Sequence, residues 1–393
     1  MSSPDEGAPR RPATRLVRAG RDGDLTGPFV NPPVVHASTV LFETVEAMRP
    51  GGQRWTYGRQ GTPTTAALEG AVAELEEAEG VVLCPSGLSA ISTALLSVLS
   101  AGDHLLMADS VYGPARRLVD TTLARLGIRT TFYDPRIGVG IADLFEERTR
   151  AVYVESPGSY TFEMQDVPAL AAVAHERGAV LVADNTWATP LFFKPLVAGA
   201  DLSIQAGTKY LGGHSDVMIG TIAANARAFG KLRETHQALG LTAAPDDVYL
   251  TLRGMRTLAV RMERQMRSGL EVACWLQGRP EVARVLHPAL PGDPGHALWR
   301  RDMTGASGLF GVVLNGWSDG KAAAFLEALS LFGIGYSWGG FESLAVPARL
   351  AGLRTVAPFE AGGALVRLHI GLEDPADLIE DLEAGFARVG NLS

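Results

Sequence analysis

Four short stretches of the sequence carry side chains that could take part in chemistry, and each follows an apolar run typical of a buried strand. Lys209 stands in QAGTKYLGGHSD, at the end of the run DLSIQA, and Asp184 ends the run AVLVAD. Tyr112 follows HLLMAD, and Gly87 follows GVVLC within the segment PSGLSA. In an open α/β sheet, ligand sites lie outside the carboxyl ends of the strands. We therefore expect these four residues to meet at one edge of a sheet.

Two of these side chains carry charges that are unusual beside a buried strand. Lysine is ordinarily a solvated surface residue, but a lysine held in a pocket has a lowered pKa, and its neutral amine can attack a carbonyl group. A carboxylate at the end of a buried strand is costly unless it is paired, and a protonated ring nitrogen would pair with Asp184. Surface exposure is the alternative for Lys209, and helix capping is the alternative for Asp184.

The other two stretches offer an anion site and an aromatic face. Ser86 and Gly87 would begin a helix, whose free N–H groups and positive dipole end attract an anion. An ordinary capped helix start would look the same in the sequence. The ring of Tyr112 could cover a planar ligand, or the residue could be a partly buried tyrosine anchored by its hydroxyl group.

Taken together, the four features match a cofactor that has a phosphate, a planar ring, a basic ring nitrogen and an aldehyde. Pyridoxal 5′-phosphate has these parts: Lys209 would bind the aldehyde, and Asp184 would keep the ring nitrogen protonated so that the ring accepts electrons. The sequence has neither a G-x-G-x-x-G motif after a strand nor a G-x-x-x-x-G-K-[ST] motif. The phosphate therefore need not belong to a nucleotide.

Further along the chain, Arg367 lies in VRLHIGLED, on a predicted strand. An arginine fork suits the α-carboxylate of an amino acid, because it binds in a bidentate manner and is always charged. A surface salt bridge is the alternative. His214 and Asp216 could suggest a metal ion, but no second cluster with ligand spacing accompanies them, so we interpret both as structural and expect no metal.

The elements that must position these residues alternate between strand and helix. The apolar runs GVVLC, HLLMAD, AVYVES, AVLVAD and DLSIQA are separated by helical stretches such as LSAISTALLSVL and VPALAAVAHERG. This alternation predicts an α/β fold with a mostly parallel sheet and helices on both of its faces.

Composition and hydrophobic periodicity divide the chain into three parts. Residues 1–60 are rich in Gly and Pro and are expected to form an arm, with about the first 12 residues disordered. Residues 61–255 form the predicted large domain, whose first helix covers 62–79, and residues 256–393 form the smaller C-terminal α/β domain. In the smaller domain we expect a long helix over 256–279, strands in 307–316 and 363–372, and a final amphipathic helix.

Composition excludes several classes of protein. The 393 residues are 46% hydrophobic and 20% charged, with a net charge of −8 and no basic stripe, which argues against a nucleic-acid partner. No apolar run reaches the roughly 18 residues of a membrane span, and the N-terminus lacks the apolar core of a secretory signal, so we expect a cytoplasmic protein. Cys84 and Cys274 stand in apolar surroundings and are predicted to be buried thiols.

The sequence also resembles the Cys/Met-metabolism PLP-dependent enzymes, the transsulfuration group, over about residues 14–390. Within that group it is most similar to bacterial cystathionine β-lyases, and YSWGG is the more discriminating segment. The similarity implies an aspartate aminotransferase-like PLP enzyme of fold type I. The matching segments are DNTW, FFKPLVAGADLSIQAGTKYLGGHSDVMIGT, YGRQGTPT, LRGMRTL, RVLHPALPG, SGLFG, YSWGGFESL and VRLHIGLED.

The resemblance implies a homotetramer, a dimer of dimers, in which the arm reaches the site of the neighbouring subunit. Tyr57 and Arg59 would there contact the partner's cofactor phosphate, and Tyr57 would also approach the substrate. The remaining implied roles are phosphate binding by the backbone of Gly87 and Leu88 and the side chain of Thr208, ring stacking by Tyr112, ring-nitrogen pairing by Asp184, aldehyde binding by Lys209, and amino-acid binding by Ser337, Trp338 and Arg367.

The implied reaction is β-elimination, in which Lys209 removes the α-proton, Tyr112 assists at the amine, and a thiol, pyruvate and ammonia are released. A lysine with this role needs a lowered pKa. The chain departs from the family pattern at Gln60, Arg117 and Gln237, positions that in the family lie toward the distal half of the substrate. The leaving group could therefore be a thiol other than homocysteine, or the changes could be neutral variation.

Other functions remain open at this point. The scaffold also suits γ-elimination, γ-replacement and racemisation, although YSWGG argues against the γ-specific members of the group. A non-catalytic protein that kept the fold is a further alternative, and the joint presence of Lys209, Asp184, Tyr112 and Arg367 speaks against it.

Overall fold

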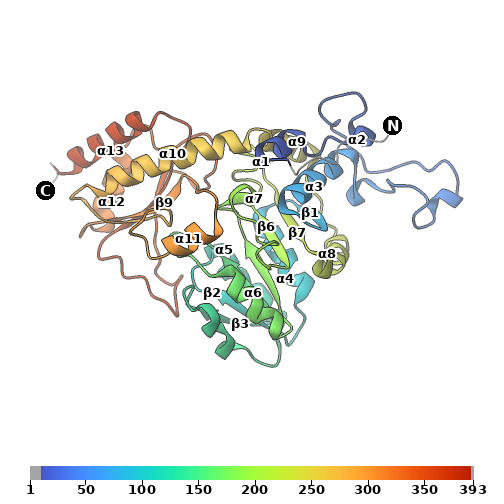
Figure 1. Cartoon of the computed structure of the whole chain (residues 1–393), viewed down its shortest axis with the longest axis horizontal. Helices are drawn as coiled ribbons and strands as arrows, with labels where there is room; N and C mark the ends of the chain where they lie inside the picture. Colours follow the sequence, from blue (N-terminus) through green and yellow to red (C-terminus); the bar gives the residue numbers. More distant parts are fainter. Residues whose placement is uncertain (1–9, 391–393) are drawn as a thin grey trace.

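The computed structural model describes residues 10–390 (Figure 1). The predicted disorder of about the first 12 residues falls mainly on residues 1–9, which lie outside the described residues, and Pro12 already begins a helix. Two sheets organise the chain, one of seven strands and one of four.

The seven-stranded sheet has the order β1-β7-β6-β5-β4-β2-β3. Its strands are β1 (Gly80–Cys84), β2 (His104–Ala108), β3 (Arg129–Tyr133), β4 (Thr149–Glu155), β5 (Val180–Asp184), β6 (Leu202–Gln205) and β7 (Gly220–Ala224). β7 runs antiparallel to both of its neighbours, and the pairings from β6 across to β3 are all parallel. The predicted mostly parallel sheet is therefore confirmed.

Helices cover both faces of this sheet, as the alternation predicted. Along β1, Val82 and Cys84 belong to one apolar core, and Val81 and Leu83 belong to a second core on the opposite face. The helices of this part are α3 (Pro63–Glu76), α4 (Gly87–Val98), α5 (Gly113–Leu118), α6 (Val167–Glu176), α7 (Thr189–Phe192), α8 (Ala226–Ala238) and α9 (Pro245–Met255), with short helical turns η3 (Val119–Leu123) and η4 (Gly138–Leu144).

The C-terminal part forms the second sheet, in which every pairing is antiparallel. The order is β10-β11-β9-β8, built from β8 (Val282–Leu286), β9 (Leu309–Leu314), β10 (Leu344–Pro347) and β11 (Leu365–His369). The helices are α10 (Leu258–Gln277), α11 (His296–Asp302), α12 (Asp319–Ala328) and α13 (Pro375–Gly390). The predicted long helix is α10, which runs along the top of the molecule in Figure 1.

The N-terminal segment is only partly the loose arm that its composition suggested. α1 (Pro12–Arg18) and α2 (Gly23–Thr26) pack on the body of the molecule, and Leu16 is buried in the same core as α3. Beyond them the chain is mostly exposed through the short turns η1 (Glu46–Met48) and η2 (Gly58–Gln60), and this blue segment extends away from the body in Figure 1. The predicted domain boundaries themselves stay a prediction.

The cysteine prediction is correct for Cys84 and wrong for Cys274. Cys84 lies in the large-domain core, where burial raises the pKa of its thiol to about 11. Cys274 is exposed. Val272, Ala273 and Leu276 share the buried face of α10, and the helical period places Cys274 on the opposite face.

Candidate active site

The carboxyl ends of the parallel strands bring three of the predicted residues together. Asp184 is the last residue of β5 and pairs with Ile204 of β6, the strand that leads into Lys209. Ala206, just after β6, donates its N–H to Thr186 Oγ1 at 2.9 Å. Gly87 opens α4 against the same segment, since a Cβ there would lie 2.6 Å from that of Ala206. The strand-end positions therefore converge as predicted.

Lys209 is largely buried and touches the C-terminal part of the chain. Its Nζ donates to Ser337 Oγ at 2.5 Å and lies 5.4 Å from the centre of the Trp338 ring. Burial and then the positive charge of Arg367 lower the pKa of this ammonium, the charge of Asp184 opposes both, and the resulting pKa is about 8. The alternative of a solvated surface lysine is excluded, and part of the population carries a neutral, nucleophilic amine near neutral pH.

The loop that carries Ser337 and Trp338 lies directly on the backbone of Lys209. Ser337 and Gly339 both have left-handed backbone angles, with φ of 80° and 86°. A Cβ on Gly339 would stand 2.9 Å from the Tyr210 nitrogen and 3.1 Å from the Lys209 Cα, so the close approach requires glycine.

His369 holds this loop in place and was missed by sequence reasoning. Its Nε2 accepts the N–H of Gly339 at 3.1 Å, and burial lowers the pKa of the imidazole to about 3, so the ring is neutral and can accept. His369 follows Arg367 by two residues on β11, which places both side chains on one face of the strand. His369 stands in the segment VRLHIGLED, but nothing in the neighbouring sequence indicated that it would accept the N–H of Gly339.

Arg367 is buried and keeps most of its donors available. Its Nη2 donates to the Ser337 carbonyl at 2.9 Å, and its guanidinium lies 5.5 Å from the centre of the Tyr160 ring. Among residues 10–390 it forms no ion pair, which excludes the surface salt bridge considered as an alternative. A buried, uncompensated guanidinium beside the lysine is suited to an incoming carboxylate.

Asp184 has hydrogen bonds but no ion pair in the described part of the chain. Its Oδ1 accepts from the N–H of Thr186 at 3.0 Å and from the Thr186 hydroxyl at 2.6 Å, and the Tyr153 hydroxyl lies 3.4 Å from Oδ2. Burial raises the pKa of the Asp184 carboxyl. A buried carboxylate of this kind gains a cationic partner from a protonated ring nitrogen.

Glu155 is a second buried carboxyl group at this edge, and sequence reasoning did not select it. It ends β4 directly opposite Asp184 in the sheet register. Its Oε2 accepts the backbone N–H of Tyr112 at 2.7 Å. Burial, and then the negative charge of Asp184, raise the pKa of Glu155 well above its ordinary value. Because two adjacent carboxylates repel each other, Glu155 is the member of the pair that holds a proton.

Tyr112 stands at the mouth of the site, immediately before α5, with 44% of its surface exposed. Burial of the rest of the side chain raises the pKa of the phenol, and the negative charge of Asp184 acts in the same direction. The hydroxyl therefore stays protonated at neutral pH. The role of Tyr112 at the substrate amine stays a prediction.

The helix start at Ser86 is a capped terminus that still offers two N–H groups. The Ser86 hydroxyl accepts the N–H of Ser89 at 3.1 Å. Gly87 and Leu88 begin α4, where N–H groups have no partner within the helix. By contrast, the Thr208 hydroxyl is already engaged, because it donates to the Ile219 carbonyl at 3.1 Å and accepts the Ile219 N–H at 3.0 Å.

Tyr57 and Arg59 do not join Lys209 within one chain. Arg59 Nη1 donates to the Gln237 carbonyl at 3.0 Å, and its guanidinium lies 5.9 Å from the Tyr57 ring centre. Arg59 therefore lies beside α8, whereas Tyr57 forms an isolated β-bridge with Thr39 in the arm. Their action on a neighbouring subunit stays a prediction.

The three positions that depart from the family pattern fall in two places. Gln60 and Gln237 line one small cavity of about 190 Å³ together with Arg59. Arg117 is exposed on α5, the helix that Tyr112 precedes. The structure thus associates two of the changes with the arm and one with the entrance of the site.

Two further observations concern metal ligands and membrane spans. His214 Nδ1 lies 2.8 Å from the Gly212 carbonyl, and no group of three potential metal ligands occurs among residues 10–390. Within the same part of the chain, no helix has the length and apolar character needed to cross a membrane.

The comparisons with known proteins agree with one another. Residues 13–387 match the model of the family described as Cys/Met metabolism PLP-dependent enzyme. The chain is 48% identical over 368 residues to the cystathionine beta-lyase of Bordetella avium, covering 91% of this chain and 92% of that protein. It is 45% identical over 388 residues to the cystathionine beta-lyase of Escherichia coli K12, covering 96% and 98%. The crystal structure of cystathionine gamma synthase from Xanthomonas oryzae pv. oryzae superposes with a TM-score of 0.90 at 35% identity, covering 98% of this chain and 100% of that chain.

Proposed function

Because this chain belongs to the Cys/Met metabolism PLP-dependent enzymes and is a cystathionine β-lyase-like carbon–sulfur lyase, we propose that it cleaves L-cystathionine or a related cysteine S-conjugate to a thiol, pyruvate and ammonia. The observation that carries the proposal is that two cationic groups lie in one site. One is the largely buried amine of Lys209, and the other is the buried guanidinium of Arg367, which has no ion-pair partner among the described residues. One group can handle a proton, and the other can hold the α-carboxylate of an amino acid.

The residues present fit pyridoxal 5′-phosphate. Lys209 would hold its aldehyde, Asp184 would pair with its ring nitrogen, Tyr112 would cover the ring, and the N–H groups of Gly87 and Leu88 would bind its phosphate. Buried Asp184, which has no cationic ion-pair partner in residues 10–390, is the observation that tests this fit. When bound, the cofactor supplies an electron sink for the charge left by loss of the α-proton.

The chain's own groups then have separate tasks. Arg367 binds the substrate carboxylate through its free donors and so orients the α-carbon toward Lys209. Lys209 Nζ, with its lowered pKa, would take the proton from the α-carbon and give it to the sulfur of the departing thiolate. Ser337 fixes that amine by accepting its hydrogen bond, and the Trp338 ring beside it limits access of water.

For the leaving group we propose a thiol on a cysteine S-conjugate that differs from homocysteine. Gln60, Arg117 and Gln237 support this, because they change charge and size where the family recognises the distal half of the substrate. The test is a substrate panel of L-cystathionine and small S-alkyl cysteines with detection of thiol and keto acid. Pyruvate indicates β-cleavage and 2-oxobutyrate indicates γ-cleavage. A clear preference for cystathionine would refute the proposal that the leaving group differs from homocysteine. 2-Oxobutyrate as the main product would refute the proposed β-lyase activity.

We further propose a cytoplasmic homotetramer with shared active sites. The exposed arm and the placement of Arg59 away from Lys209 support the sharing. Two inactive variants, Lys209→Ala and Arg59→Met, should regain activity when they are mixed and reassembled, because one site of each mixed dimer then has both residues intact. Equal inactivity of the mixture and of the separate variants would refute shared sites.

A further inference from the structure

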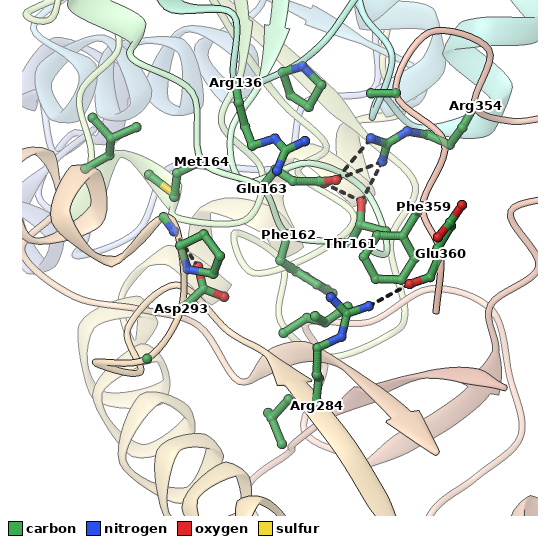
Figure 2. Close-up of a pocket in the computed structure, with 18 of the residues that line it drawn as sticks. Arg136, Thr161, Phe162, Glu163, Met164, Arg284, Asp293, Arg354, Phe359 and Glu360 are labelled. Atoms are coloured by element: carbon green, nitrogen blue, oxygen red, sulfur yellow. Dashed lines mark hydrogen bonds and ion pairs between the residues drawn. The ribbon is translucent and has the colours of Figure 1, made fainter. Parts of the chain in front are cut away.

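One large cavity in the described part of the chain is lined by none of the residues around Lys209. It has a volume of about 720 Å³, within the range of about 300–1,000 Å³ typical of small-molecule sites. Its walls come mainly from four segments: the turn after β3, the chain after β4, the strand β8 with the loop that follows it, and the segment before β11. Figure 2 labels residues of all four, among them Arg136, Glu163, Arg284 and Phe359. The cavity therefore lies between the part of the chain that forms the seven-stranded sheet and the part that forms the four-stranded sheet. Ligands often bind between two such parts of a protein.

One part of the cavity wall is apolar. The rings of Phe162 and Phe359 and the side chain of Met164 lie on it, together with Leu286 and Leu298. Such a surface suits a hydrocarbon or thioether side chain.

Most of the charged groups around the cavity already neutralise one another. Arg354 Nη1 and Glu163 Oε1 lie 3.0 Å apart, and both side chains are largely buried. Asp166 is bound by Arg301 at 2.7 Å. The carboxylates of Glu163 and Asp166 therefore already have cationic partners.

Three charged residues of the lining, Arg284, Asp293 and Glu360, form no ion pair among residues 10–390. Glu360 is exposed, so water solvates its carboxylate, whereas Asp293 is partly buried. Arg284 donates to the backbone carbonyl of Glu360 at 2.9 Å and lies 4.9 Å from the centre of the Phe359 ring, so its positive charge has no carboxylate. Asp293 Oδ1 accepts the N–H of Gly295 at 2.7 Å, and the carboxylate forms no ion pair among residues 10–390. Burial raises the pKa of the Asp293 carboxyl, and the charge of Glu163 adds to the rise, which a bound cation would relieve.

We propose that this cavity binds a free α-amino acid with an apolar side chain, its carboxylate on Arg284 and its ammonium on Asp293. A zwitterion supplies a carboxylate for Arg284 and an ammonium for Asp293 in one small molecule. The hydrogen bonds that it forms with both groups are charge-assisted and therefore strong. The side chain then lies on the wall formed by Phe162, Met164 and Phe359. The inference goes beyond the proposed function and does not depend on it.

The cavity shares a backbone segment with the active site. Thr161 and Glu163 line the cavity, and Tyr160 immediately before them faces the guanidinium of Arg367. An occupant is therefore placed to alter how Arg367 binds a substrate carboxylate.

Titration calorimetry with L-methionine tests the proposal on the cofactor-loaded protein. The Arg367→Met variant lacks the carboxylate clamp of the active site and should still bind one L-methionine per chain. Adding Arg284→Met should lower that affinity at least tenfold, and adding Arg300→Met, an exposed arginine on α11 outside the cavity, should not change it. Asp293→Asn should weaken binding in the same way as Arg284→Met.

Two analogues separate the zwitterion from a simple charge. N-acetyl-L-methionine lacks the ammonium and L-methioninamide lacks the carboxylate, so both should bind at least tenfold more weakly. Binding of the N-acetyl compound equal to that of L-methionine would mean an anion site only and would overturn the proposal. So would the absence of heat in Arg367→Met up to about 10 mM ligand, ten times a 1 mM dissociation constant. If Arg367→Met does not fold, borohydride-reduced wild-type protein, whose active-site lysine is blocked, replaces it.

Discussion

The lowered pKa of Lys209 makes a prediction that needs no cofactor. The ammonium of an ordinary lysine titrates near 10.5, and burial together with the charge of Arg367 brings this one to about 8. A difference of about 2.5 pH units means roughly 300-fold more neutral amine at pH 7 than an ordinary lysine has. Lys209 should therefore react with a small amine-directed reagent far below the pH at which lysines normally react.

The assay is competitive labelling of cofactor-free protein with a trace of acetic anhydride, followed by peptide mapping over a range of pH. The labelling of Lys209 should be half-maximal near pH 8. The exposed Lys231 in the same sample is the internal reference.

Two variants should move this midpoint in opposite directions. Arg367→Met removes a positive charge that favours the neutral amine, so the midpoint of Lys209 should rise. Asp184→Asn removes a negative charge that favours the ammonium, so the midpoint should fall. A wild-type midpoint near 10.5, or an Arg367→Met variant with a lower midpoint than wild type, would refute this account of the site.

Three other predictions concern single side chains. Glu155→Gln should keep kcat/KM within about threefold, because the amide imitates the protonated acid, whereas Glu155→Ala should lose at least about tenfold because the N–H of Tyr112 loses the acceptor that positions it; equal losses would contradict the assigned protonation. His369→Ala should lower kcat/KM by about 10- to 100-fold, since Gly339 loses its acceptor, and unchanged kinetics would show that the loop does not depend on it. Ellman's reagent should modify Cys274 in the native protein and Cys84 only after denaturation, and two fast thiols per chain would contradict the burial of Cys84.

Much of the large sheet could be predicted because its signals are local. The five apolar runs are continuous and short, and in four of them a predicted site residue stands at the end of the run or within a few residues after it. β3 was missed because RTTFY is half polar, and β7 because GTIAA begins with glycine and has small side chains; both strands are stabilised by their neighbours. The helix α1 was missed for a similar reason, since a single buried leucine, Leu16, anchors it to the body.

The sequence by itself determined which side chains end the strands, and therefore that Lys209, Asp184, Tyr112 and Gly87 would share one edge. That inference needs only the geometry of parallel strands, which the chain must obey whatever packs around it. Only the tertiary structure decided that Glu155 lies opposite Asp184, that the Gly339 loop rests on Lys209 and that Arg367 has no ion pair in the described chain. These facts depend on contacts between segments far apart in the sequence, and no local pattern records which partner a buried polar group will find.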